Sequence, residues 1–366
     1  MEPVLSLVRI LTKEQLKSCR INAGNQSNKT MDQNIRIPVE RMKSEFTRIL
    51  KKTGSSDLKA EKCADIFAIN SLEGVYSHGV NRFPRFVMNI REGFIVPDAE
   101  PALVNGTGSM EQWNGNLGPG PLNASFATGR ATELAEKYGI GLVAMANTNH
   151  WIRGGTYGWQ AARKGFIFIG WTNTEANMPA WGAVDARLGN NPFVVAVPFE
   201  REAIVLDFAM TQFSYGKMET YKREGRKLPF PGGFNAEGEL TDDPVEILNT
   251  RRTLPIGNWK GSGFSLLLDI LATVISGGLS THEITKRRVE YGVSQVFIAI
   301  CLKRLHNFSS IENTVIRIIN DLKSSNRENK NTAIRYPGEN IVKIRNQNLA
   351  SGIPVNKELW KEIEAL

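Results

Sequence analysis

The stretch Gly139-Ile-Gly-Leu-Val-Ala144 decides which kind of α/β fold this chain can adopt. Its glycines and final alanine imitate the G-x-G-x-x-G/A fingerprint of a Rossmann dinucleotide site. In a Rossmann turn the glycines follow a strand and open a helix, so that free N–H groups face the pyrophosphate. Here the order is reversed, because a helical pattern (Gly120–Tyr138) precedes the stretch and a β-type run (Leu142–Met145) follows its start. A Rossmann site at this position is excluded, and Gly139 is expected to end the helix.

Helical and β-type patterns alternate along the rest of the chain. Apolar residues recur at helical spacing from Pro38 to Gly54 and again over Asp57–Leu72. Further helices are predicted at about 262–275, 310–323 and 357–366, and further strands at 166–171, 193–197, 204–208 and 296–302. Interleaved helices and strands of this kind are typical of an α/β or α+β fold, and we predict α/β.

Composition excludes several classes of protein. The chain has 366 residues, 41% of them hydrophobic and 22% charged, which are ordinary globular values. Its longest apolar run is shorter than the roughly 18 residues that a membrane span needs. The net charge of +8 is spread out rather than striped, and no zinc-finger or ribonucleoprotein motif occurs, so we predict neither nucleic-acid nor membrane binding. Three scattered cysteines favour a reduced, cytoplasmic setting and no metal site.

The first 36 residues differ from the remainder. They are rich in Asn and basic residues, show no sustained period, and lack the features of a signal peptide. We expect an extension there, either disordered or the result of a start assigned upstream of Met31. The catalytic unit is expected to cover residues 37–366: a helical part at about 37–115, a cofactor-binding α/β core at about 116–330, and a C-terminal segment that returns to the core.

Two of the four histidines lie in settings that suit chemistry. His78 stands beside Gly79 at a break between helical patterns, and Arg82 follows four residues later. An imidazole exchanges protons near neutral pH, and an arginine fork holds a carboxylate in two parallel bonds. The alternative for this pair is a capping histidine and a surface arginine. His150, in the loop after the Leu142–Met145 run, is either a structural residue or a substrate ligand.

Two further segments have residue types that suit contacts with a dinucleotide. Asp207 ends an apolar strand, where a carboxylate either meets a ribose hydroxyl or caps a helix. Asn258-Trp-Lys-Gly-Ser-Gly263 opens a helix, and glycines with a lysine at a helix start suit a phosphate, while Trp259 suits a flat ring. The alternative for this second piece is a glycine-rich turn with an incidental lysine.

The ordered set of these strings resembles the type 2 malate/L-lactate dehydrogenase family, a non-Rossmann group of nicotinamide-dependent oxidoreductases. The resemblance covers about residues 37–366. It rests on G-V-Y-S-H-G-V-N-R-F-P-R (Gly74–Arg85), N-H-W-I-R-G-G (Asn149–Gly155), Y-G-W-Q-A-A (Tyr157–Ala162), G-N-N-P (Gly189–Pro192), F-S-Y-G (Phe213–Gly216), N-W-K-G-S-G (Asn258–Gly263) and R-Y-P-G-E (Arg335–Glu339).

The resemblance implies a mixed sheet with flanking helices, a homodimer, and roles for particular residues. It makes His78 the proton donor to a substrate carbonyl, and it places Arg82 and His150 beside the substrate. The cofactor is expected to be NAD(H), with NADP(H) as the alternative. The positions that match the family's cofactor site are Ile204, Val205, Leu206, Asp207, Phe208, Ala209, Met210, Trp259, Lys260, Gly338, Glu339 and Asn340.

The implied reaction is reduction of a keto acid, and the positive charge suits an anionic sugar acid. Malate, L-lactate, ureidoglycolate and sulfolactate are alternative substrate pairs on the same scaffold. A basic binding protein without catalysis is a further alternative, against which the presence of His78, Arg82 and Lys260 speaks.

Overall fold

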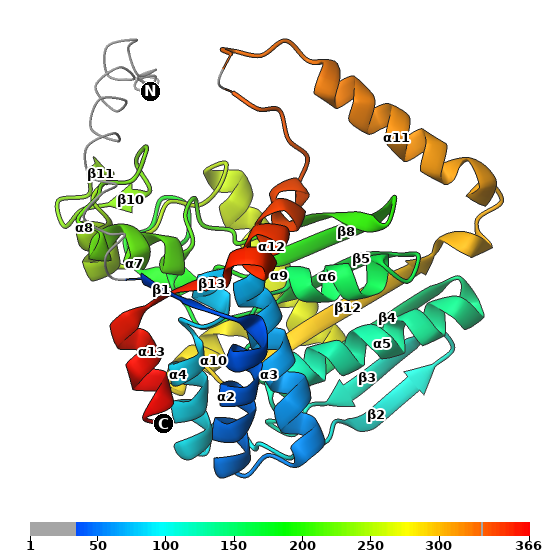
Figure 1. The fold of residues 1–366 in the computed structure, drawn as a ribbon, viewed down its shortest axis with the longest axis horizontal. Coiled ribbons are helices and arrows are strands. Elements are labelled where there is room, and N and C mark those ends of the chain that lie inside the picture. The colour runs from blue at the N-terminus through cyan, green and yellow to red at the C-terminus, as the bar shows by residue number, and fades with distance from the viewer. Residues whose placement is uncertain (1–33, 331) are drawn as a thin grey trace, which may run out of the picture.

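The computed structural model describes residues 34–330 and 332–366, and its centre is a seven-stranded mixed sheet. The strand order is β2-β3-β4-β12-β5-β8-β9, in which β3 and β4 are parallel and the other neighbours are antiparallel. The strands are β2 (Ala102–Thr107), β3 (Met110–Asn114), β4 (Ile140–Thr148), β5 (Phe166–Thr172), β8 (Phe193–Phe199), β9 (Glu202–Phe208) and β12 (Val293–Cys301). The predicted α/β class with a mixed sheet is confirmed (Figure 1).

Helices cover both faces of this sheet because side chains alternate along a strand. On β12, Phe297 and Ala299 pack in the core beneath α5 (Gly120–Tyr138) and α6 (Gly155–Ala162). Val296 and Ile298 pack in the core beneath α9 (Trp259–Ser276) on the opposite face. Gly139 ends α5 with a φ of 91°, and β4 starts at the next residue, so the predicted exclusion of a Rossmann turn is confirmed.

A second core lies in the N-terminal helices α2 (Val39–Lys52), α3 (Asp57–Leu72) and α4 (Phe83–Arg91). The C-terminal strand β13 (Ile353–Asn356) pairs with β1 (Asn34–Ile37), and α13 (Lys357–Glu364) adds Trp360 and Ile363 to the same core. The C-terminal segment was expected to return to the α/β core. Ile341 and Val342 of this segment pack against the α/β core, while β13 and α13 complete the N-terminal helical unit (Figure 1), because their apolar faces are buried there.

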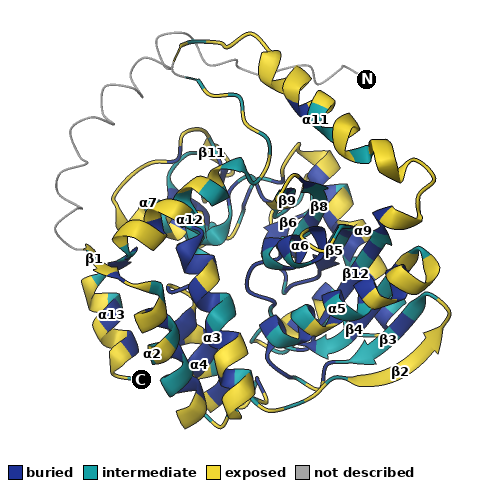
Figure 2. Ribbon diagram, turned by 45° about the vertical axis from the view of Figure 1, so that its right-hand side comes forward, coloured by how far each residue is buried: buried dark blue, intermediate teal, exposed yellow. Residues whose placement is uncertain are grey.

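Several other elements were not anticipated from the sequence, whereas the helix predicted at about 310–323 is present at Phe308–Ser324. The segment 37–115 was expected to be helical, yet it ends in the hairpin β2–β3 of the main sheet. The remaining elements are η2 (Tyr76–His78), β6 (Met178–Pro179), β7 (Ala186–Leu188), α7 (Tyr215–Arg223), β10 (Gly233–Phe234), β11 (Leu240–Thr241), α8 (Pro244–Thr250), α10 (Thr281–Lys286), η3 (Leu302–Arg304), α11 (Phe308–Ser324) and α12 (Glu339–Ser351). Helix α11 projects from the body and is exposed along most of its length (Figure 2).

The expected extension over residues 1–36 falls on residues 1–33, which lie outside the described residues, and on residues 34–36, which belong to β1. Within the described part of the chain, no helix is long and apolar enough to cross a membrane.

Candidate active site

His78 is held on a short, tightly packed turn between α3 and α4. A Cβ added to Gly79 would lie 2.2 Å from the Ser71 hydroxyl oxygen, so only glycine allows the turn to pack against α3. That hydroxyl accepts a hydrogen bond from the Val80 amide at 2.8 Å, and Asn70 donates to the carbonyl oxygen of His78 at 2.9 Å. The backbone under the imidazole is therefore fixed on both sides.

His150 faces His78 from the loop that follows β4. Asn149 anchors this loop by donating its side-chain amide to the carbonyl oxygens of Leu117 and Gly118. The Ile152 amide donates to Nδ1 of His150 at 2.9 Å, so Nδ1 is unprotonated and Nε2 carries the hydrogen of the neutral ring. The two imidazole rings are nearly parallel, with centroids 6.2 Å apart. The structure thus brings together two histidines that are far apart in the sequence.

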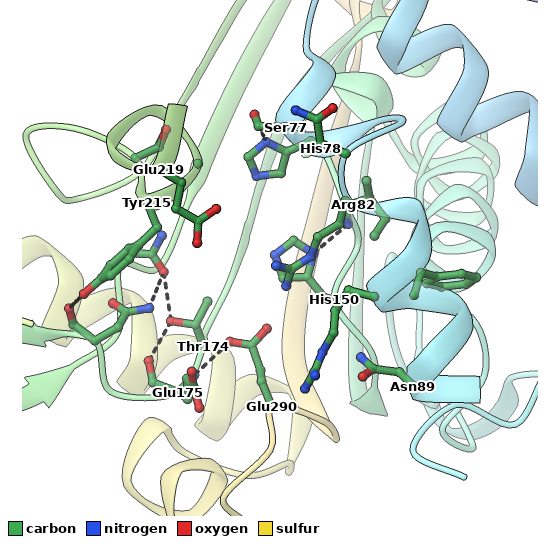
Figure 3. Close-up of a pocket in the computed structure, with 18 of the residues that line it drawn as sticks. Ser77, His78, Arg82, Asn89, His150, Thr174, Glu175, Tyr215, Glu219 and Glu290 are labelled. Atoms are coloured by element: carbon green, nitrogen blue, oxygen red, sulfur yellow. Dashed lines mark hydrogen bonds between the residues drawn. The ribbon is translucent and has the colours of Figure 1, made fainter. Parts of the chain in front are cut away.

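Both rings line one cavity of about 810 Å³ together with Arg82 (Figure 3). Among the described residues, the guanidinium of Arg82 has no ion-pair partner within 4 Å, which leaves it free for an anionic ligand. The other lining residues include Arg85, Asn89, Thr174, Glu175, Asn177, Asn190, Tyr215, Glu219, Arg251, Arg288 and Glu290.

The environment keeps both histidines neutral. Burial, followed by the positive charges of Arg82 and Arg153, lowers the pKa of His78 to about 4. Burial and Arg82 also hold the pKa of His150 well below its ordinary value. An anion bound beside Arg82 would offset one of these charges and favour the protonated form of His78.

Arg153 is itself held by a buried ion-pair network next to this loop. It pairs with Glu73, whose other carboxylate oxygen accepts from Arg345 at 2.7 Å. Arg345 also pairs with Glu202 at 2.7 Å. Since Glu73 ends α3 and Arg345 lies on α12, the C-terminal segment is tied to the element that leads into His78.

The predicted cofactor residues form a second surface that adjoins the cavity, because the Met210 amide donates to the carbonyl oxygen of the cavity-lining Asn190 at 2.8 Å. The run Ile204–Met210 covers the end of β9 and the two residues after it, and the C-terminal segment lies beside it. The Val205 amide donates to the carbonyl oxygen of Pro337 at 3.1 Å, and the next residue, Gly338, has a φ of 90°. The other end of the run is next to the start of α9, because the Ile256 amide donates to Met210 at 2.8 Å. Three separated segments therefore adjoin one another, although they do not line the histidine cavity.

The individual residues of that surface differ in character. Trp259 is 63% exposed, and α9 begins there without a side-chain cap. Asp207 accepts a hydrogen bond from the Gly155 amide at 2.7 Å, so it occupies the N-terminus of α6, as the capping alternative requires. Glu339 pairs with Lys323, which ties the start of α12 to the end of α11.

Glu290 and Asn177 were missed in the sequence. Glu290 accepts from the Glu175 amide at 3.1 Å, and burial raises the pKa of its carboxyl group while Arg82 acts in the opposite direction. Neither residue has a local signal, because both lie in irregular segments next to strands. Within residues 34–330 and 332–366, no group of three or more His, Cys, Asp or Glu residues is arranged to hold a metal ion.

Comparisons with known proteins identify the family to which the chain is similar. The family model described as malate/L-lactate dehydrogenase matches residues 37–364. The 2,3-diketo-L-gulonate reductases of Citrobacter koseri and Escherichia coli are each 45% identical over 333 residues, which is 91% of this chain and all of theirs.

Solved structures show the same fold. Malate dehydrogenase from Pyrococcus horikoshii matches with a TM-score of 0.82 and 27% identity, covering 90% of this chain and 94% of that one. Sulfolactate dehydrogenase from Methanocaldococcus jannaschii matches with a TM-score of 0.80 and 26% identity, covering 90% and 95%. The family and its named relatives are dehydrogenases and reductases of hydroxy and keto acids. The chain belongs to the malate/L-lactate dehydrogenase family.

Proposed function

We propose that this protein reduces 2,3-diketo-L-gulonate at C2 to 3-keto-L-gulonate with NADH as the hydride donor. The observation that carries the proposal is the cavity in which His78, His150 and the unpaired Arg82 share one wall. The relatives that are 45% identical over their full length are named as reductases of this substrate.

The residues of the second surface fit a dinucleotide. The family depends on a pyridine nucleotide. Lys260 and the uncapped N-terminus of α9 offer positive charge and free amide groups to a pyrophosphate. Trp259 offers an exposed flat ring, and Gly338 lets the chain come close to β9. We propose that these residues, with Ile204–Met210, Glu339 and Asn340, hold the cofactor.

The cavity residues then have separate roles in the reaction. When bound, the cofactor supplies a hydride to the keto carbon. Arg82 binds the substrate carboxylate in two parallel bonds, and Nε2–H of His150 donates to a substrate oxygen. His78, protonated when the substrate anion offsets Arg82, gives its proton to the carbonyl oxygen. General acid catalysis of this kind contributes on the order of 10²–10⁴-fold in rate.

A homodimer is part of the proposal. On α9, Leu267, Leu271 and Val274 lie at helical spacing on one face and are 55%, 43% and 71% exposed. An apolar face of this kind is typical of a surface that pairs with a second subunit. The cytoplasmic location remains a prediction that rests on the small number of cysteines.

The alternative substrates are malate, L-lactate, ureidoglycolate and sulfolactate, or the corresponding keto acids. The hypothesis of a basic binding protein is not retained, because the family and its named relatives are enzymes. All of these substrates would undergo the same reaction, so an assay must compare the values of kcat/KM for the different keto acids.

The test is NADH oxidation, followed by absorbance, with 2,3-diketo-L-gulonate, oxaloacetate, pyruvate and sulfopyruvate. We expect the highest kcat/KM with 2,3-diketo-L-gulonate, and a higher kcat/KM for NADH than for NADPH. A preference for another keto acid would overturn the substrate assignment but not the family.

A further inference from the structure

One wall of the histidine cavity is built from hydrogen-bond acceptors, and the proposed chemistry uses none of them. Glu290 lies between the wall that carries Arg82 and His150 and the wall that carries Thr174, Glu175 and Tyr215 (Figure 3). Its Oε2 atom accepts from the Glu175 amide at 3.1 Å. Among the described residues, no donor is bound to its Oε1 atom, so that oxygen is available to a ligand.

A second acceptor on this wall also has no partner. The side-chain oxygen of Asn177 is buried and receives no hydrogen bond, while its amide nitrogen donates to Asn190 at 3.0 Å. The backbone of Asn177 is held by the Tyr215 hydroxyl, which donates to its carbonyl oxygen. Leaving a buried acceptor unpaired costs about 1–3 kcal/mol, so a donor from a ligand would be favoured here.

We propose that Glu290 and Asn177 form a subsite for the hydroxyl groups of a polyhydroxy acid, in the same cavity as the carboxylate-binding Arg82. Hydroxyl groups are neutral donors, which suits a carboxylate and an amide oxygen with free lone pairs. Short keto acids such as pyruvate have no donor to place there. This inference rests on the proposed function, because it names the residues that would bind the hydroxylated tail of the proposed substrate.

The size and polarity of the cavity support this ligand class. A volume of about 810 Å³ is near the upper end of the roughly 300–1,000 Å³ range of small-molecule sites. Arginines and unpartnered acceptors in one cavity match a ligand that carries both an anionic group and hydroxyl groups.

The experiment compares two substrates in three variants. Glu290→Gln keeps the shape but loses the charge, and Glu290→Asp keeps the charge but shortens the reach. Glu362→Gln is the control for loss of a carboxylate, because Glu362 is exposed on α13, away from the cavity lining. The substrates are 2,3-diketo-L-gulonate and 2-ketobutyrate, which has an apolar tail. Thermal unfolding of each variant with NADH checks that it is folded.

We expect Glu290→Gln and Glu290→Asp to lower kcat/KM for 2,3-diketo-L-gulonate about ten- to a hundredfold, the usual worth of a hydrogen bond to a charged group. The value for 2-ketobutyrate should change less than about threefold, within the range of a lost peripheral contact. Glu362→Gln should leave both values unchanged. Equal losses for both substrates in Glu290→Gln would overturn the subsite, and a weaker binding of NADH in that variant would assign Glu290 to the cofactor instead.

A binding measurement separates this inference from the proposed reaction. With NADH present, wild-type protein should bind L-gulonate more tightly than 2-hydroxybutyrate by calorimetry, and Glu290→Gln should remove the difference. Equal affinities in the wild type would refute the subsite whatever the turnover. Tighter binding of L-gulonate without turnover of any keto acid would leave the subsite standing and refute the proposed reaction.

Discussion

Replacing Glu73 by Gln is the sharpest test of how the helical unit is joined to the α/β unit. The Glu73 side chain is 3% exposed, and its two oxygens bind Arg153 and Arg345. Gln preserves the shape of the side chain but removes its charge. Arg153, with a side chain only 6% exposed, would then lose this ion pair, and the buried carboxylate of Asp207 would offset its charge only in part.

The expected cost follows from that burial. Breaking a buried ion pair by removing one partner costs about 3–5 kcal/mol, because the remaining charge is left uncompensated. Arg345 keeps Glu202 at 2.7 Å, so the loss falls mainly on Arg153. We therefore expect Glu73→Gln to lower the free energy of unfolding by about 3 kcal/mol or more.

The assay is equilibrium unfolding in urea, followed by circular dichroism at one fixed protein concentration, since the proposed dimerisation would make stability depend on concentration. Glu133→Gln is the control, because Glu133 pairs with Arg130 at 2.7 Å while 65% exposed. An exposed pair of this kind contributes up to about 1 kcal/mol. A loss in Glu73→Gln no larger than in the control would refute the assignment of Glu73 as a structural junction.

Three more outcomes are expected. His78→Gln should lower kcat at least roughly tenfold while the Kd for NADH, measured by fluorescence, stays unchanged; retained turnover would assign the proton transfer to another group. In the free protein, an NMR titration should give His78 a pKa near 4. Because this pKa is depressed, the unfolded chain takes up the proton first, so stability should fall as the pH drops from 6.5 towards 4, and less so in His78→Gln. Val274→Glu should halve the mass measured by light scattering, because it places a charge on the apolar face of α9; an unchanged dimer would place the interface elsewhere.

The local sequence pattern was sufficient to predict those helices whose own residues show apolar spacing and a closing glycine. The helices at Asp57–Leu72 and Gly120–Tyr138 were predicted with the bounds that the structure shows, because apolar spacing and a closing glycine depend only on neighbours in the chain. The hairpin β2–β3 was missed, since β2 is exposed throughout and shows no alternation. Helix α12 was missed as well, because α3, against which it packs, lies far away in the sequence.

For the site, the sequence by itself determined the candidates for chemistry, and the tertiary structure decided which of them meet. His78, Arg82 and His150 could be singled out because imidazole and guanidinium groups in glycine-rich breaks are uncommon enough to be noticed. The cavity that these residues share with Glu290, and the ion pair between Arg345 and Glu73, are formed by residues that lie far apart in the sequence. Such contacts are set by how the sheet, the helical unit and the returning C-terminal segment pack, and this packing leaves no periodic trace in the sequence around any one of these residues.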